Sequence, residues 1–149
     1  MPKKPTSADA QLVLQLYDFR REAEMRKARA WFAGFRPASA NDILEVVNNF
    51  GTPENAWFRQ VTSYWDMAAA LVLSGALNED LFTDTNGEMW FVFSKLHPFL
   101  AEARKTSKRP QLLLRLEKMA KKSKIGRERL SSMEKQFAGR REAAAGKSS

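Results

Sequence analysis

The sequence predicts an all-α protein, in the form of a compact helical bundle of about four helices followed by a basic, partly helical C-terminal extension. The first observation is that apolar residues recur every three to four positions through most of residues 7–103, which is the spacing of one face of an α-helix. The second is that the one run that could form a strand, residues 89–93, has no second strand pattern to pair with.

The third observation is an uneven division of charge. Residues 104–149 carry fifteen Lys and Arg against four Asp and Glu, a net charge of +11, whereas residues 1–103 carry a net charge of −3. Nearly all aromatic residues precede residue 100. We therefore predict a helical bundle domain over residues 7–103 and a basic C-terminal extension over residues 104–149. The extension should be helical near residues 110–138 and disordered at its end, and the bundle should fold without it.

Two helices open the predicted bundle. The first is expected to run unbroken from about Ser7 to Gly34, with Glu22 and Arg26 paired on its solvent face at i,i+4 spacing. The second covers about residues 41–49 and begins after Ser39, whose side chain is suited to cap a helix N-terminus.

The third predicted helix has the clearest start. Thr52 can cap it, Pro53 occupies the first helical position, and Glu54 meets the positive end of the helix dipole. Apolar residues cover much of its circumference as far as Gly75, so we expect this helix at the centre of the fold. A single helical turn over residues 79–82 and a helix over residues 88–103, kinked or restarted at Pro98, complete the bundle.

Beyond the bundle, residues 104–109 are predicted to be a linker, and Pro110 to open the helix of the extension. Gly126 is expected to interrupt that helix.

Most enzyme chemistry has little support in this sequence. There is no cysteine, the single histidine is His97 beside a proline, and no glycine-rich phosphate loop or metal-binding motif is present. The oxygen-rich stretch between Asn78 and Glu88 lacks EF-hand spacing and fits loops and helix caps better. We expect a protein that is not an enzyme and that uses no cofactor and no metal ion.

The basic extension is the first candidate for function, because a basic amphipathic helix is typical of segments that contact nucleic acid, an anionic membrane or an acidic protein. An acidic protein or a nucleic-acid backbone is the partner we expect, with simple solubility as the alternative purpose of the charge. The predicted polyanion-binding residues are Arg104, Lys105, Lys108, Arg109, Arg115, Lys118 and Lys122. Only Phe137 adds an aromatic ring among these charges, so stacking on single-stranded bases is not indicated.

The alternative function is a small-ligand or regulatory module with a pocket along the third helix. Asp66 lies within the least polar helix, and buried acids are usually paired. Its carboxylate could be structural, bonded to Arg59, Thr62 or another helix, or it could anchor a ligand. The predicted pocket residues are Trp57, Arg59, Tyr64, Trp65 and Asp66.

The compartment is indicated only indirectly. The absence of cysteine fits a reducing environment, residues 1–6 lack a following signal-like apolar run, and the weakly polar run at residues 67–77 is about half of a membrane span. We expect a soluble, cytoplasmic protein.

Residues 57–69 (WFRQVTSYWDMAA), followed by residues 74–82 (SGALNEDLF), resemble a family of small uncharacterised bacterial helical proteins. The resemblance covers roughly residues 8–100 and leaves the basic extension outside. It implies a bacterial, helical, soluble protein. Because that family has no established activity, the resemblance implies no site residues.

Overall fold

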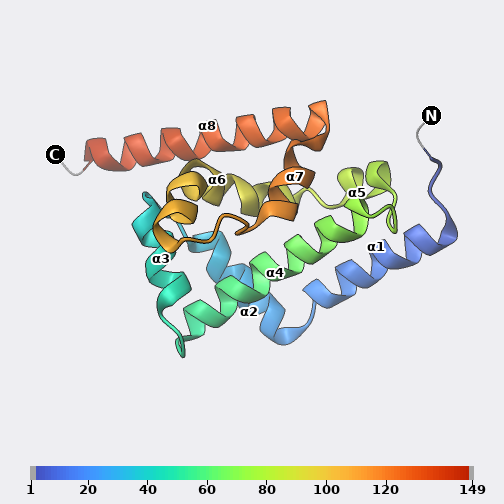
Figure 1. Ribbon diagram of the computed structural model, residues 1–149, viewed down its shortest axis with the longest axis horizontal. Helices are drawn as coiled ribbons and strands as arrows, with labels where there is room; N and C mark the ends of the chain where they lie inside the picture. The colour runs from blue at the N-terminus through green and yellow to red at the C-terminus, as the bar shows by residue number, and fades with distance from the viewer. Residues whose placement is uncertain (1–2, 148–149) are drawn as a thin grey trace.

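A computed structural model describes residues 3–147, and within this range it contains eight α-helices and no β-strand (Figure 1). The all-α prediction is confirmed, whereas the estimate of about four helices is wrong. The helices are α1 Ser7–Arg20, α2 Ala23–Gly34, α3 Ala40–Asn48, α4 Pro53–Leu73, α5 Glu79–Thr85, α6 Glu88–Ser107, α7 Leu114–Lys122 and α8 Lys124–Lys147.

The first predicted helix is in fact two helices. It breaks at residues 21–22, where the Glu22 side chain accepts hydrogen bonds from the backbone N–H groups of Glu24 (3.0 Å) and Met25 (2.8 Å). These are donors that the first turn of a helix leaves without an intrahelical partner. Glu22 therefore starts α2 and does not simply continue the solvent face of α1. The break lets α2 turn and pack against α4.

Helix α4 lies at the centre of the fold, as the sequence predicts, and contacts α2, α3, α5 and α7. Its start is the predicted one, because the Thr52 hydroxyl accepts from the backbone N–H of Asn55 at 3.2 Å and Pro53 follows. Trp65 of α4 is fully buried and meets Phe82 of α5, which in turn meets Trp90 of α6. The core is therefore continuous from α4 through α5 to α6 along these three rings.

Helix α6 is longer than predicted. It passes through Pro98 and continues to Ser107, so residues 104–107 are helix and not linker. Leu96, Leu100 and Ala103 are buried on both sides of the proline, and this packing holds the helix where Pro98 removes one backbone donor. The helix ends at Lys108, whose φ of 58° is left-handed and turns the chain toward α7.

The basic C-terminal segment packs on the rest of the fold. Leu116, Met119 and Ala120 of α7 are buried against α4 and α6 in the main core cluster, together with Leu130 of α8. Helix α8 lies along α6 at one side of the molecule (Figure 1). It extends through Lys147, so the disorder expected after residue 138 is not seen in the described residues 139–147. The packing of the C-terminal segment is explained by the apolar residues that lie among its lysines, Leu116, Met119 and Leu130.

Gly126 does not interrupt the C-terminal helix; it lies buried in the first turn of α8. A Cβ atom there would come within 2.7 Å of the Ala120 carbonyl oxygen and 3.1 Å of Trp90 Nε1. The same Trp90 Nε1 donates a hydrogen bond to the Ala120 carbonyl at 3.1 Å. The missing side chain of Gly126 therefore permits the close approach of α8 to the end of α7.

Candidate anion-binding surface

The seven predicted polyanion-binding residues divide into two groups. Three of them already have carboxylate partners within the protein. Arg104 pairs with Glu117 at 2.9 Å, Arg115 with Asp66 at 2.9 Å, and Lys122 with Glu79 at 2.5 Å. These three join α6 to α7, α7 to α4, and α7 to α5. Each pair therefore links two helices within the fold.

Arg104 also closes the loop between α6 and α7. Its Nε and Nη2 donate to the Leu112 carbonyl oxygen at 3.0 and 2.8 Å. Its partner Glu117 also accepts from Lys121 at 3.1 Å. Partial burial would raise the pKa of Glu117, but the hydrogen bonds from Arg104 and Lys121 outweigh it and hold that pKa below its usual value.

The other four residues are exposed, and within residues 3–147 their side chains form no ion pair or hydrogen bond. Lys105 lies at the end of α6, Lys108 and Arg109 lie in the following loop, and Lys118 lies on α7; Figure 1 shows these segments. We refer to these four as the basic surface: Lys105, Lys108, Arg109 and Lys118. Because they give up no internal contact, they can meet phosphate or carboxylate groups at no cost to the fold.

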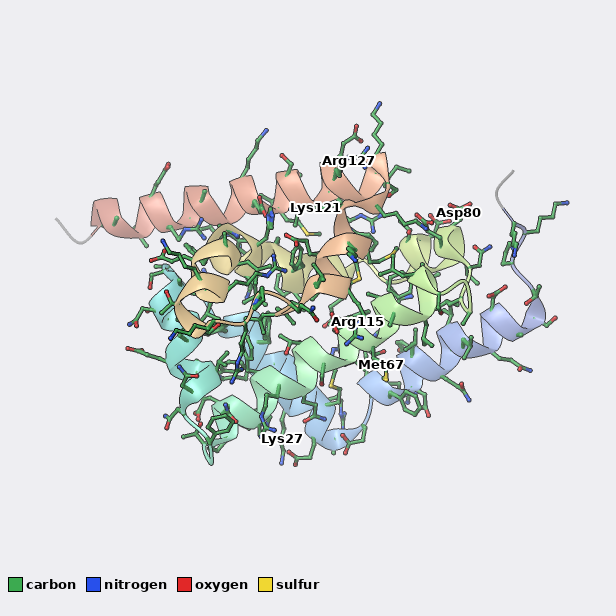
Figure 2. All side chains as sticks on the ribbon, in the orientation of Figure 1. Lys27, Met67, Asp80, Arg115, Lys121 and Arg127 are labelled. Carbon is green, nitrogen blue, oxygen red and sulfur yellow. The ribbon has the colours of Figure 1, made fainter. Side chains whose placement is uncertain are left out.

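Asp66, the centre of the alternative pocket, is occupied by α7. Its Oδ2 accepts from Arg115 Nε at 2.9 Å, and its Oδ1 accepts from the backbone N–H of Leu116 at 3.0 Å. Figure 2 shows Arg115 where the start of α7 lies against α4. Leu113, the residue before α7, supplies no side-chain cap, so Asp66 caps α7 from a neighbouring helix.

The remaining residues of the alternative pocket also make contacts within the protein, although the buried Trp65 Nε1 has no hydrogen-bond partner among residues 3–147. Arg59 Nε donates to Asn55 Oδ1 at 3.0 Å, and the Tyr64 hydroxyl donates to the Leu16 carbonyl at 2.5 Å. Trp57 packs near Trp31, and the buried Trp65 ring lies under a guanidinium. These side chains therefore make separate contacts at several places along α4 and do not line one common pocket.

The guanidinium over Trp65 belongs to a buried polar network that sequence reasoning missed. Arg20 Nη1 donates to Asn86 Oδ1 at 2.7 Å, and its Nε lies 3.7 Å from Glu88 Oε2. Glu88 also accepts two bonds from Arg29, at 2.9 and 3.1 Å. Burial raises the pKa of the neighbouring Tyr64 hydroxyl. The network ties α1 and α2 to the start of α6, and it supplies the buried Arg20 with the partly exposed carboxylate of Glu88.

His97 is paired with Glu134 of α8, so its ring also links two helices. Among residues 3–147, no three His, Asp or Glu side chains gather closely enough to hold a metal ion. None of the helices in that range has both the length and the apolar character needed to cross a membrane.

Sequence reasoning also missed a second group of cations, which line a cleft: Arg36, Lys95, Arg140 and Arg141. They come from the loop after α2, from α6 and from α8, so no local spacing connects them. The one available signal was Lys95, a charged residue inside the apolar pattern of residues 89–100.

A family model described as a domain of unknown function, DUF4760, matches residues 5–123. The match ends between α7 and α8, so it includes the part of the basic segment that packs into the core. The chain matches no curated protein and no solved structure.

Proposed function

The chain belongs to the DUF4760 family of domains of unknown function, and we propose that it is a non-enzymatic, cytoplasmic interaction protein that binds an acidic protein or a nucleic-acid backbone. The observation that carries this proposal is the basic surface, Lys105, Lys108, Arg109 and Lys118. These cations are exposed and have no internal partner within residues 3–147. They belong to a segment with a net charge of +11, while the rest of the chain is close to neutral.

The expected binding is electrostatic and independent of base sequence. Four side-chain cations meeting phosphates would release about four counterions, so the slope of log affinity against log salt should be roughly −3 to −4 on duplex DNA. Lysine and arginine contacts to phosphate set position and affinity, but they do not distinguish base pairs. No set of side chains suited to base edges accompanies these four.

The test is a titration of labelled duplex DNA, and in parallel of labelled polyglutamate, at several salt concentrations. The test variant carries Lys105→Gln, Lys108→Gln, Arg109→Gln and Lys118→Gln. The matched control carries Lys3→Gln, Lys4→Gln, Arg21→Gln and Arg26→Gln, four exposed cations near α1 and the start of α2. Both variants have the same net charge, so a difference between them reports the location of binding and not the total charge.

We expect the test variant to bind at least one of the two polyanions about tenfold more weakly or worse, with a flatter salt dependence, and the control to stay within about twofold of the natural protein. Equal losses in both variants would mean that net charge alone is responsible. Absence of binding to either polyanion at about 50 mM salt would contradict the proposal.

A further inference from the structure

A cleft lies between the C-terminal half of α8 and the loop that joins α2 to α3. Its volume is about 270 Å³. The residues that line it are Arg36, Pro37, Ala38, Lys95, Phe137, Arg140, Arg141 and Ala144. Four of these side chains are cationic and none is a carboxylate. No residue of the basic surface lines the cleft.

Lys95 is the buried cation of the cleft, with 4% of its surface exposed. Its Nζ donates to the carbonyl oxygens of Phe32, Ala33 and Phe35 at 2.8 to 2.9 Å. An ammonium group has one proton for each of these acceptors, so charged Lys95 can donate to all three carbonyl groups at the end of α2. With its donors engaged, Lys95 contributes positive potential to the cleft, and a ligand would need hydrogen bonds from elsewhere.

The three arginines supply those donors. None of them forms an ion pair within residues 3–147, although Arg140 lies over the Phe137 ring and Arg141 over the Phe99 ring. Asp42, which accepts from the Ala38 backbone N–H, and Glu134, which pairs with His97, form no ion pair with these arginines. The cleft therefore concentrates positive charge that the described part of the protein does not neutralise.

The arginines and Lys95 lie close enough to affect one another. Burial, together with the positive charges of Arg36 and Arg140, lowers the pKa of Lys95 to about 8. The three cations repel one another around this partly enclosed space, so an anion that binds between them lowers their electrostatic energy.

The rest of the lining is apolar. Phe137, Pro37, Ala38 and Ala144 offer carbon surface between the charged groups. The cleft is slightly smaller than the roughly 300–1,000 Å³ typical of pockets for drug-sized ligands. A planar guanidinium binds a carboxylate or phosphate through two parallel hydrogen bonds. A simple inorganic anion would use the charge and leave the apolar surface uncovered.

We propose that this cleft binds a small organic anion in which a carboxylate or phosphate head group is joined to an apolar body. The head group lies between Arg36 and Arg140, near the charge of Lys95, and the apolar body lies against Phe137 and Pro37. A medium-chain carboxylate has this chemistry and this size.

The first experiment titrates three probes into the full-length protein and follows backbone amide signals by NMR. Octanoate carries both the head group and the chain, acetate carries the head group alone, and octylamine carries the chain with the opposite charge. We expect octanoate to bind with a Kd of about 1 mM or below, with shifts centred on Arg36, Ala38 and residues 137–144. Acetate should bind at least tenfold more weakly, and octylamine should produce no shifts at these residues.

The second experiment compares Arg36→Gln and Arg140→Gln with Lys135→Gln. All three side chains are exposed, so the substitutions leave the fold intact, but Lys135 does not line the cleft. Each arginine variant should bind octanoate at least fivefold more weakly, while Lys135→Gln stays within about twofold. Octanoate affinity that is unchanged in both arginine variants, or octylamine binding as strong as that of octanoate, would overturn the proposal.

This inference is independent of the proposed function. The fourfold variant at Lys105, Lys108, Arg109 and Lys118 should bind octanoate as the natural protein does. Loss of polyanion binding in that variant and loss of octanoate binding in the arginine variants are therefore separate results, and either can fail alone.

Discussion

The two halves of the basic C-terminal segment differ in their surroundings, and the more basic half is the one that packs into the core: residues 114–130 carry seven Lys and Arg against two Glu, and residues 131–147 carry four against two. In residues 114–130, Leu116, Met119 and Leu130 are buried in the core, and the cations lie around them. In residues 131–147, no side chain is fully buried, and Arg140 and Arg141 line an open cleft. A high density of lysine and arginine therefore does not mark the end of the fold. What shows that a basic segment belongs to the fold is the presence of a few apolar residues at helical spacing.

The largest expected effect comes from removing the inner half. A fragment of residues 1–108 loses α7 and exposes the buried faces of α4 and α6, including the Trp90 indole that bonds to Ala120. We expect it to melt without cooperativity, although the sequence alone suggested that it would fold independently. A fragment of residues 1–134 keeps the buried stripe and should melt cooperatively. Calorimetry of both fragments measures the difference, and cooperative melting of the shorter one near the full-length midpoint would place α7 outside the core.

A point substitution sharpens the same comparison. Leu116→Ala should lower the free energy of unfolding by about 2–5 kcal/mol, because the side chain is fully buried and leaves a cavity. Ile125→Ala, in the same segment but 60% exposed, should change it by about 0.5 kcal/mol or less. Urea unfolding of the two variants is the measurement. Similar values for both would mean that α7 does not pack as described.

Substitution of two glycines of α8, Gly126 and Gly139, should change stability in opposite directions. Gly126→Ala should destabilise the protein by about 1–3 kcal/mol, since the new Cβ would meet backbone oxygen at 2.7 Å. Gly139→Ala has nothing within 4 Å of its Cβ and should stabilise the protein by about 0.5–1 kcal/mol through helix propensity. Thermal unfolding of both variants distinguishes them. A stabilising Gly126→Ala would contradict the close approach of α8 to α7.

The last expected effect concerns pH and Lys95. Its pKa is about 8 in the folded protein, against an ordinary value of 10.5. Between these two values the unfolded chain binds more protons at this residue than the folded chain, so its contribution to stability rises with pH over that window. Below pH 8 the residue is charged in both states and the contribution is constant at its lowest value.

Stability measured from pH 7 to 10.5 in the natural protein and in Lys95→Met should therefore diverge above about pH 8, with the natural protein gaining relative to the variant. The fragment of residues 1–134 lacks Phe137 and Arg140, so its Lys95 should be less buried and have a pKa closer to 10.5. Parallel pH profiles for the natural protein and Lys95→Met would show that burial does not shift this residue.

The sequence predicted those features that depend on neighbouring residues. The Thr52–Pro53 start of α4 and the Ser39 cap of α3 are both observed. The break at Glu22 was missed, because glutamate is not among the residues that usually cap helices. Helix boundaries set by strong caps were thus predictable, whereas a break made by an unusual cap was not.

Tertiary relationships were less predictable. The partner of Asp66 is Arg115, 49 residues away, and the four cations of the cleft come from three separate segments. No local pattern brings such residues together. The apolar stripe of α7 was visible in the sequence, but the surrounding cations favoured a separate extension, and only the contacts with α4 and α6 show that it completes the core.

Native-state hydrogen exchange tests most directly whether α7 belongs to the core. Amides of α7 (residues 114–122) would be compared with those of α4 and with those of residues 135–147. We predict that the slowest α7 amides exchange with about the same free energy as those of α4, because both open only on global unfolding, and that residues 135–147 exchange at much lower cost. If α7 exchanges as fast as residues 135–147 while α4 stays protected, the C-terminal segment is an appendage and its packing is not part of what stabilises the fold.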